Sequence, residues 1–368
     1  MNAPIRVGVI GANPDQSWAS KSHLPALQAL PQFKLMAVST TRQETANQAA
    51  QRFGAPLAFK NHHDLVVHPE VDMVTVAVKV PQHYELVLAA LNAGKHVYCE
   101  WPLGNGLEQT VEMADLARRH KVRTAMGLQG RASPWVNAVR DLIAAGTLGR
   151  ILSSSVVASA AMMGPATTAR SSYTLDRRNG ATMLTISFGH LIDAVLYSLG
   201  EATELSSLMA TQRTQIKVTD TNESLPMTAS DQIIVNALLE SGAVMSVHMR
   251  GGVSRGTNLL WEINGSEADL VVTADTPFVH FGPLHLKLGR GSTAALESLP
   301  VVDDVPDVPS QLKGGPAFNV SCLYTRFASD IRNGTQLCAS FDDAVRRHHL
   351  LNIIEKSDSL GKRLRVAE

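Results

Sequence analysis

The stretch Ile5-Arg6-Val7-Gly8-Val9-Ile10-Gly11-Ala12-Asn13 decides the fold of this chain. Its apolar residues before Gly11 predict a short, buried, parallel strand. Gly11 ends that strand, and the alanine-rich segment from Ala19 to Leu30 predicts a helix. A strand, a glycine turn and a helix form the unit that holds a dinucleotide pyrophosphate, because a helix N-terminus offers free N–H groups and a partial positive charge.

The glycine pattern departs from the full fingerprint G-x-G-x-x-G. Asn13 stands at the second glycine position, and the third position falls within Pro14-Asp15-Gln16-Ser17. Asparagine tolerates a positive φ better than most residues, so the turn can still form with a longer loop before the helix. Gly11 and Asn13 are therefore candidate cofactor contacts, and a strand–helix turn without a ligand is the alternative.

Length and composition indicate a two-domain protein without a bulk electrostatic field. The 368 residues suggest two domains, and we place the boundary between residues 1–127 and 128–368. Lys+Arg and Asp+Glu both number 33, so we expect neither nucleic acid nor an anionic membrane as a partner. The first strand begins almost at once, which leaves no room for a signal peptide, and no apolar run approaches the ~20 residues of a membrane span. Three widely spaced cysteines suit a reducing compartment, so we expect a cytoplasmic protein.

The second predicted strand, Phe33 to Val38, bears on the choice of dinucleotide. It ends in Ser39-Thr40-Thr41-Arg42, where a dinucleotide fold places the group that meets the adenosine ribose. An acidic residue there would favour NAD, whereas small hydroxyls with an arginine can hold a 2′-phosphate. Ser39, Thr40 and Arg42 are thus candidate contacts and predict NADP, with NAD as the alternative. Arg42 could also be an ordinary solvated residue at a helix start.

The pattern of elements divides the chain into two fold classes. Strand and helix patterns alternate through residue 127, which predicts an α/β domain with a doubly wound parallel sheet, the Rossmann fold. Beyond it, Ser241-Gly242 and Asn264-Gly265 separate adjacent strand-like runs as hairpin turns. We therefore expect an α+β second domain with a large, open, mainly antiparallel sheet. Its other predicted elements are the strand 151–163, the helix 181–199 and two closing helices, 316–332 and 342–360.

Several local motifs resemble the glucose–fructose oxidoreductase / inositol dehydrogenase (Gfo/Idh/MocA) family over nearly the whole chain. The family-like motifs are Val7-Gly8-Val9-Ile10-Gly11, Ala89-Ala90-Leu91-Asn92-Ala93-Gly94-Lys95-His96-Val97, Glu100-x-Pro102-Leu103 and Gly189-His190-Leu191-Ile192-Asp193. Within the family, four features are closer to the branch of the fungal galactose-pathway repressor: Gly11-x-Asn13, Trp18-Ala19, His23-x-Pro25-Ala26 and Val78-Lys79-Val80-Pro81.

This resemblance implies a nucleotide-binding first domain and a second domain whose open sheet carries substrate on one face. The other face of that sheet often pairs subunits in the family, which implies a homodimer or homotetramer. The family chemistry usually lies in a Glu-Lys-Pro motif and in an Asp four residues before a His on one helix. Here the first motif reads Glu100-Trp101-Pro102, and the residue four before His190 is Ile186. Of the Lys-Asp-His set, only His190 is present.

Hydride transfer between an alcohol and a nicotinamide needs a group that takes or gives the hydroxyl proton. His190 is the first candidate because histidine titrates near neutral pH, although it could be a hydrogen-bonded helix residue. Lys79 follows a predicted strand at the cofactor edge of the sheet, where a desolvated lysine could replace the missing one. Its alternatives are a cofactor contact or a salt bridge to Glu100. Tyr173 is a third possible acid, with an ordinary loop tyrosine as the alternative, in a loop that also carries Arg170, Arg177 and Arg178.

The remaining candidate contacts surround the nicotinamide end of the predicted site. Trp101 could stack on the nicotinamide or an aromatic substrate, or it could fill the cleft. We also expect Trp18, Val78, His83 and Glu100 to contact the cofactor, with orientation of the loop as the alternative for His83. The pairs His62-His63 and His348-His349 lack cysteine or carboxylate partners at metal spacing, so no metal site is predicted.

The favoured hypothesis is an NAD(P)-dependent oxidoreductase, with NADP preferred, that acts on a small hydroxyl or carbonyl substrate such as a sugar derivative. The nicotinamide would lie between Trp101, Lys79 and His190. The alternative is a catalytically silent NADP-binding regulator that acts through a protein partner. The two missing motif residues and the branch resemblance favour this alternative.

Overall fold

The computed structural model describes residues 3–15, 17–291 and 295–366. These residues form two compact units, and the division between them does not follow a single point in the chain. The first unit runs to Ala132 and takes in Asp304–His348, and the second comprises Ser133–Asp303 and the residues from His349 onward. A C-terminal segment thus returns to the first unit, a feature that the predicted boundary after residue 127 did not include.

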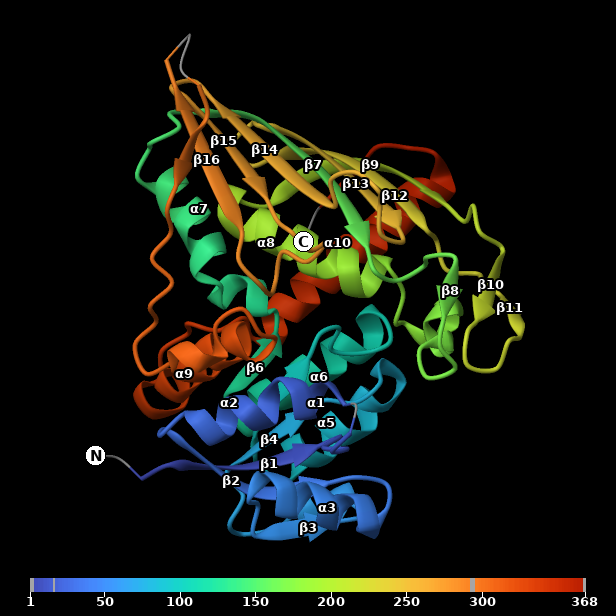
Figure 1. The fold of residues 1–368 in the computed structure, drawn as a ribbon, viewed down its shortest axis with the longest axis vertical. Helices are drawn as coiled ribbons and strands as arrows, with labels where there is room; N and C mark the ends of the chain where they lie inside the picture. Colours follow the sequence, from blue (N-terminus) through green and yellow to red (C-terminus); the bar gives the residue numbers. More distant parts are fainter. Residues whose placement is uncertain (1–2, 16, 292–294, 367–368) are drawn as a thin grey trace. The chain divides into compact units, whose positions relative to one another are not determined.

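The first unit is built on a six-stranded sheet in which every neighbouring pair is parallel. The strand order β3-β2-β1-β4-β5-β6 is the doubly wound order of dinucleotide-binding folds (Figure 1), which confirms the predicted fold class. The strands are β1 (Ile5–Ile10), β2 (Phe33–Ser39), β3 (Leu57–Phe59), β4 (Met73–Val76), β5 (His96–Glu100) and β6 (Thr124–Gly127).

The helix predicted over 19–30 is interrupted at Ser22, where φ is −127° and ψ is −65°. Pro25 has no N–H for the carbonyl of residue 21, and its ring would clash with that carbonyl, so a continuous helix cannot form. The helices of this unit are α1 (Trp18–Lys21), α2 (His23–Ala29), α3 (Gln43–Phe53), α4 (His62–Val66), α5 (His83–Asn92), α6 (Leu107–His120) and α9 (Ala317–Asn333), with the short turns η1 (Val80–Gln82), η2 (Gln129–Ala132) and η6 (Ser310–Leu312).

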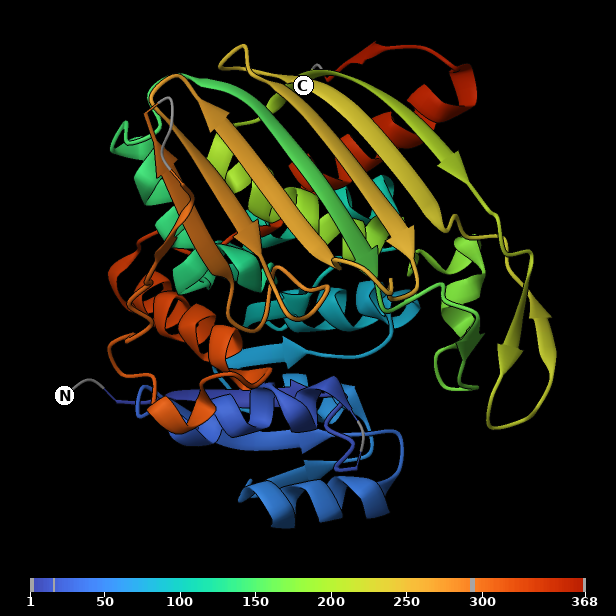
Figure 2. The same ribbon diagram turned by 45° about the horizontal axis from the view of Figure 1, so that its top comes forward.

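The second unit contains a nine-stranded sheet of order β17-β16-β15-β14-β7-β13-β12-β9-β18 (Figure 2). Only β7 and β13 pair in parallel among these strands, so the predicted mainly antiparallel sheet is confirmed. The strands are β7 (Ile151–Ala160), β9 (Ala202–Ala210), β12 (Gln232–Leu239), β13 (Val244–Gly251), β14 (Leu259–Gly265), β15 (Ala268–Thr273), β16 (His285–Arg290), β17 (Glu297–Leu299) and β18 (Leu364–Arg365). A separate small sheet joins β8 (Ala166–Thr167), β10 (Gln215–Val218) and β11 (Ser224–Pro226).

Helices cover one face of the nine-stranded sheet, and the opposite face carries no helix in the part of the chain that the structure describes (Figures 1 and 2). On the covered face lie buried residues such as Val156, Val247 and Trp261, whose indole Nε1 donates to Ser154 Oγ at 2.9 Å. The helical elements of this unit are α7 (Pro134–Ala144), η3 (Ser172–Leu175), η4 (Arg177–Asn179), the π-helical turn η5 (Leu184–Phe188), α8 (Gly189–Leu199) and α10 (Phe341–Leu360), which begins in the first unit.

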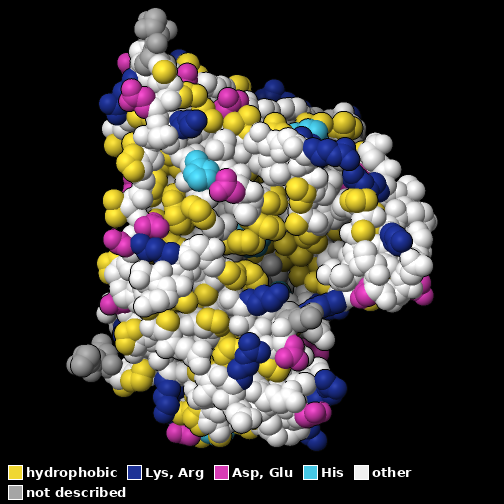
Figure 3. All heavy atoms as spheres, in the orientation of Figure 1, with side chains coloured by type: hydrophobic (Ala, Val, Ile, Leu, Met, Phe, Trp, Pro, Cys, Tyr) yellow, Lys and Arg dark blue, Asp and Glu magenta, His cyan; other side chains and the backbone are white. Residues whose placement is uncertain are grey.

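One face of the molecule carries both signs of charge side by side (Figure 3). On the face drawn in Figure 3, basic and acidic side chains are interspersed rather than gathered into one large patch, in keeping with their equal numbers in the sequence. Among the described residues, no helix has the length and apolar character that a membrane crossing requires.

Candidate functional site

The turn after β1 requires a glycine. Gly11 has a φ of +94°, and a Cβ added there would lie 2.3 Å from the backbone oxygen of Ala77. The amides of Gly11 and Ala12 both donate to the carbonyl of Ser39, at 3.0 and 3.2 Å. The turn therefore lies tightly against the ends of β2 and β4, as the turn after the first strand of a dinucleotide-binding fold does.

The loop that replaces the usual glycines is held by its own polar groups. Asn13 Oδ1 accepts a hydrogen bond from the amide of Asp15, and Ser17 Oγ donates to the Asn13 carbonyl at 2.6 Å. Ser17 Oγ also accepts from the Ser20 amide, so it caps α1. Trp18 begins α1 and is half-buried, and Gln16 lies outside the described residues.

At the end of β2, the three predicted ribose contacts differ in accessibility. Ser39 is buried, and its carbonyl is engaged by the glycine turn. Thr40 Oγ1 donates to the Arg42 carbonyl at 2.8 Å and lies 2.6 Å from Thr45 Oγ1. Arg42 is exposed at the start of α3. Arg42 is therefore the group of this set that is most available to a ribose or a 2′-phosphate.

His83 links the loops after β4 and β5 instead of presenting a free ring nitrogen. Its Nδ1 lies 2.8 Å from the Pro102 carbonyl oxygen and its Nε2 lies 3.1 Å from the Val78 carbonyl oxygen. The ring is buried, and this burial lowers the pKa of His83 despite the two carbonyls. Lys79 is exposed, which is a solvated environment and not the desolvated one that a proton-transferring lysine needs.

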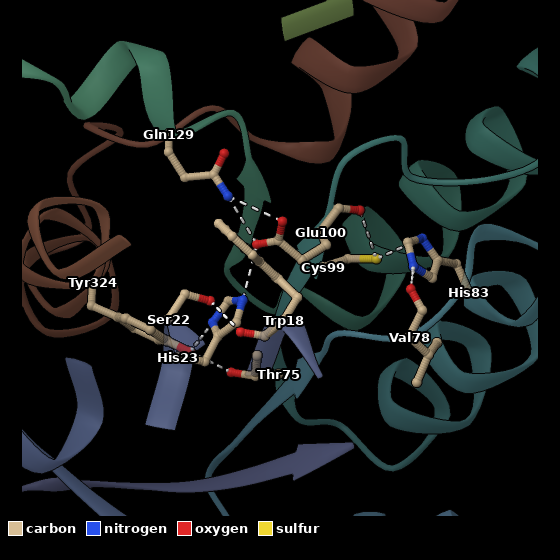
Figure 4. Close-up of polar contacts among 10 residues, drawn as sticks. All are labelled: Trp18, Ser22, His23, Thr75, Val78, His83, Cys99, Glu100, Gln129 and Tyr324. Carbon is tan, nitrogen blue, oxygen red and sulfur yellow. Dashed lines mark hydrogen bonds and ion pairs between the residues drawn. The ribbon is translucent and has the colours of Figure 1, made fainter. Parts of the chain in front are cut away.

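Glu100, at the end of β5, is the centre of a buried polar network (Figure 4). Its carboxylate accepts from His23 Nε2 at 3.0 Å and from Gln129 Nε2 at 3.1 and 3.0 Å. His23 Nδ1 lies 2.9 Å from Tyr324 Oη, which lies 2.8 Å from Thr75 Oγ1. With its proton on Nε2, a neutral His23 donates to Glu100 and accepts from Tyr324, which in turn accepts from Thr75, so one tautomer satisfies the whole chain.

The network also shows which functional residues sequence reasoning missed. His23 stands in a motif quoted for the family resemblance but received no role, and Tyr324 comes from α9, 301 residues further along the chain. Gly127 is a local feature of the sequence that points to this network. It pairs with Glu100 across β5 and β6, and a Cβ there would lie 2.8 Å from Glu100 Oε1, so a side chain at position 127 would disturb the carboxylate. Gln129 Oε1 is buried without a hydrogen-bond partner among the described residues.

These observations test whether the first unit fits a dinucleotide. A Cβ at Gly11 would collide with the backbone of Ala77, so only glycine lets this turn lie as close to the end of β4 as a dinucleotide-binding fold requires. The residues present therefore fit the cofactor that the fold implies.

Trp101, which replaces the family lysine, is buried and packs in the first unit on His348. The two ring centroids are 4.9 Å apart, and the planes are inclined by 49°. The packing of Trp101 on His348 favours the interpretation in which the indole fills the cleft. Stacking of the indole on a nicotinamide stays a prediction.

His348 makes stability depend on pH below neutrality. Burial lowers its pKa from 6.5 to about 4, so the unfolded chain binds the proton first as the pH falls. The stabilising contribution of His348 to the free energy of unfolding is fully present above pH ~6.5. It is lost as the pH falls towards ~4, by up to about 1.4 kcal/mol per pH unit. We expect His348→Asn to flatten this decline in urea unfolding measured between pH 7 and pH 4.5. An unchanged slope, equal to that of the exposed control His120→Ala, would contradict the assignment.

In the second unit, His190 is paired with a histidine that the sequence did not single out. His190 is the second residue of α8, directly after the π-helical turn η5, and it is buried. The ring of His280, from the loop between β15 and β16, stacks on it with centroids 3.9 Å apart and planes inclined by 13°. Burial, and then the charge of His190, lowers the pKa of His280 well below its usual value. Simultaneous protonation of both rings is therefore unfavourable.

Phe278 and Phe281 extend this pair into an aromatic cluster. Phe281 contacts His280 edge to face at 4.6 Å and stacks on Phe278 at 4.3 Å. Tyr173, the other predicted acid of this unit, lies in η3, and burial raises its pKa. That direction makes Tyr173 a poorer proton-transfer group than His190 near neutral pH.

Fold and site together define a class of protein, in which a dinucleotide-binding Rossmann unit is joined to a unit with an open antiparallel sheet. Residues 5–128 match the model described as "Oxidoreductase family, NAD-binding Rossmann fold", and residues 134–274 match "Gal80p, C-terminal domain". The chain belongs to the Gfo/Idh/MocA oxidoreductase family, in the branch that carries a Gal80p-type C-terminal domain.

Similar proteins include both regulators and enzymes. The galactose/lactose metabolism regulatory protein GAL80 of Kluyveromyces lactis is 30% identical over 316 residues, which cover 79% of this chain and 69% of that protein. The dehydrogenase aclE of Aspergillus oryzae is 28% identical over 376 residues, 98% of each chain. The structure of a levoglucosan dehydrogenase in complex with NADH and levoglucosan superposes with a TM-score of 0.85, at 22% identity and full coverage of both chains.

Proposed function

We propose that this chain is an NAD(P)-dependent oxidoreductase that oxidises or reduces a small hydroxyl or carbonyl compound, such as a sugar derivative. The observation that carries the proposal is the buried, stacked pair of His190 and His280 in the second unit. A histidine side chain titrates near neutral pH and can therefore transfer a proton to or from a hydroxyl group. The first unit supplies the glycine turn that fits a dinucleotide. Two of the similar proteins, aclE and the levoglucosan enzyme, are dehydrogenases by name.

In this proposal, a ring nitrogen of His190 takes the hydroxyl proton during oxidation and returns it during reduction. The nicotinamide, when bound, accepts or supplies the hydride. His280 disfavours a second proton on the pair, so that His190 can release its proton again. Lys79, exposed at the end of β4, serves as a cofactor contact instead of a proton donor. Glu100 is held by His23 and Gln129 and keeps the end of β5 in place.

A regulator that binds the dinucleotide without turnover is the second candidate function. Trp101 stands where the family lysine is expected, Ile186 stands where the aspartate is expected, and the GAL80 relative is named as a regulatory protein. Such a protein would act through a protein partner. The helix-free face of the nine-stranded sheet, with the exposed residues Leu208 and Val244, is where we expect two copies of the chain to pair in either case.

The experiment that separates the two functions follows the reduced-nicotinamide absorbance band with the full chain, NADP(H) or NAD(H), and a panel of sugars, polyols, ketones and aldehydes. Turnover that depends on His190 supports the oxidoreductase. Tight dinucleotide binding with no turnover on any member of the panel would overturn it and favour the regulator.

The cofactor preference is tested at Arg42. We propose that NADP is preferred, because Arg42 is exposed at the end of β2, where a 2′-phosphate would lie, and no acidic residue is present there. We expect Arg42→Ala to weaken NADP binding at least about tenfold, the loss of one charge-assisted contact, and NAD binding by less than about twofold. Binding is measured by titration calorimetry. Equal losses for both dinucleotides would refute the NADP assignment.

A further inference from the structure

The surface between α4 and α5 of the first unit brings together three metal-ligating side chains that are separated in the sequence. His62 and His63 begin α4, and Glu85 lies in the first turn of α5. Their ligand atoms all lie within 4.8 Å of one another. The two imidazoles alone gave no reason to expect a site, because the carboxylate comes from the next helix along the chain.

The orientation of His62 is the second observation. Its Nε2 is buried and has no hydrogen-bond partner within the described part of the chain, although it lies 3.9 Å from Glu85 Oε1. That separation is too long for a hydrogen bond. Zinc bonds to imidazole nitrogen and carboxylate oxygen are about 2.0–2.2 Å long, so two ligand atoms of a tetrahedral ion lie about 3.4 Å apart. The two atoms would therefore have to approach by about half an ångström to share an ion.

The remaining two ligands can adjust to an ion at little cost. His63 and Glu85 are exposed, and the His63 ring already lies against the His62 ring, with centroids 4.0 Å apart. Asn61 fixes the start of α4 because its Oδ1 accepts from the His63 amide at 2.8 Å.

We propose that His62, His63 and Glu85 form a site for a divalent transition-metal ion of the zinc type, which links α4 to α5. Two imidazoles and one carboxylate are a ligand set that suits Zn²⁺, with water completing the coordination. An ion held by both helices stabilises the folded first unit, because the unfolded chain does not keep the three ligands together. This site is independent of the proposed oxidoreductase function.

The test is titration calorimetry of the full chain with ZnCl₂, together with thermal unfolding with and without Zn²⁺. We expect one ion per chain in the tightest phase, a Zn²⁺-dependent rise in Tm, and a Kd at least tenfold weaker in His62→Ala and in Glu85→Gln. Glu85 is exposed, so Glu85→Gln should fold normally and keeps the test valid if His62→Ala does not. The exposed His120→Ala is the matched control and should bind as the parent chain does. Binding that changes no more in the site variants than in His120→Ala would overturn the proposal.

Discussion

Replacing His190 by alanine is expected to lower kcat of the proposed reaction by about 10²–10⁴-fold, the usual contribution of a general acid or base. His190 is buried on α8 with His280 stacked 3.9 Å away, so solvent has little opportunity to replace its imidazole as a proton carrier. The dinucleotide Kd should change by less than about twofold, because the residues that we assign to the cofactor lie in the first unit. The measurements are steady-state turnover on an active substrate and dinucleotide titration.

Two further variants separate proton transfer from a loss of packing. His280→Ala removes the stacked ring but leaves His190 in place, so we expect the pH profile of kcat to shift while most of the activity remains. His285→Ala, in the exposed part of β16, should behave as the parent chain does. If His190→Ala kept more than about a tenth of the parent kcat in a folded protein, His190 would not be the proton-transfer group.

The sequence was sufficient for features that local pattern determines. The apolar run before Gly11, the alternation of strands and helices, and the hairpins at Ser241-Gly242 and Asn264-Gly265 led to the correct fold class in both units. The interruption between α1 and α2 was not predicted, because the alanine-rich composition favoured one continuous helix and the effect of Pro25 was not considered. Strands such as β3 and β17 span three residues each, which is too short for a periodic signal.

The sequence was insufficient where function depends on residues brought together by tertiary structure. His280 lies in a loop without a motif, and tertiary structure, including the pairing of β15 with β16, fixes the position of that loop. Glu85 reaches His62 only because α4 and α5 pack together. Both ring nitrogens of His83 face backbone carbonyls, which fits the alternative in which His83 orients the loop, and its contact with the cofactor stays a prediction.

Removing the Glu100 carboxylate is expected to cause a large loss of stability in the first unit. Glu100→Ala would leave His23 Nε2 and Gln129 Nε2 buried without an acceptor, and each stranded donor costs about 1–3 kcal/mol. The Glu100 side chain is only 12% exposed, so water cannot replace the lost contacts. We therefore expect the free energy of unfolding to fall by about 2–6 kcal/mol in urea titrations, the sum for two stranded donors.

Two control substitutions show whether the hydrogen bonds cause this loss. Glu100→Gln keeps the size of the side chain and one oxygen that can accept from His23 and Gln129, but it places an NH₂ group where the second oxygen accepted from Gln129, so its cost should be about half that of alanine. Glu70→Ala, at an exposed position of the same unit, should change stability by less than about 0.5 kcal/mol. Tyr324→Phe should also destabilise, because it leaves His23 Nδ1 without its donor and Thr75 without its acceptor. Equal stability of Glu100→Ala and Glu70→Ala would mean that the network is not what holds β5 against α2 and α9.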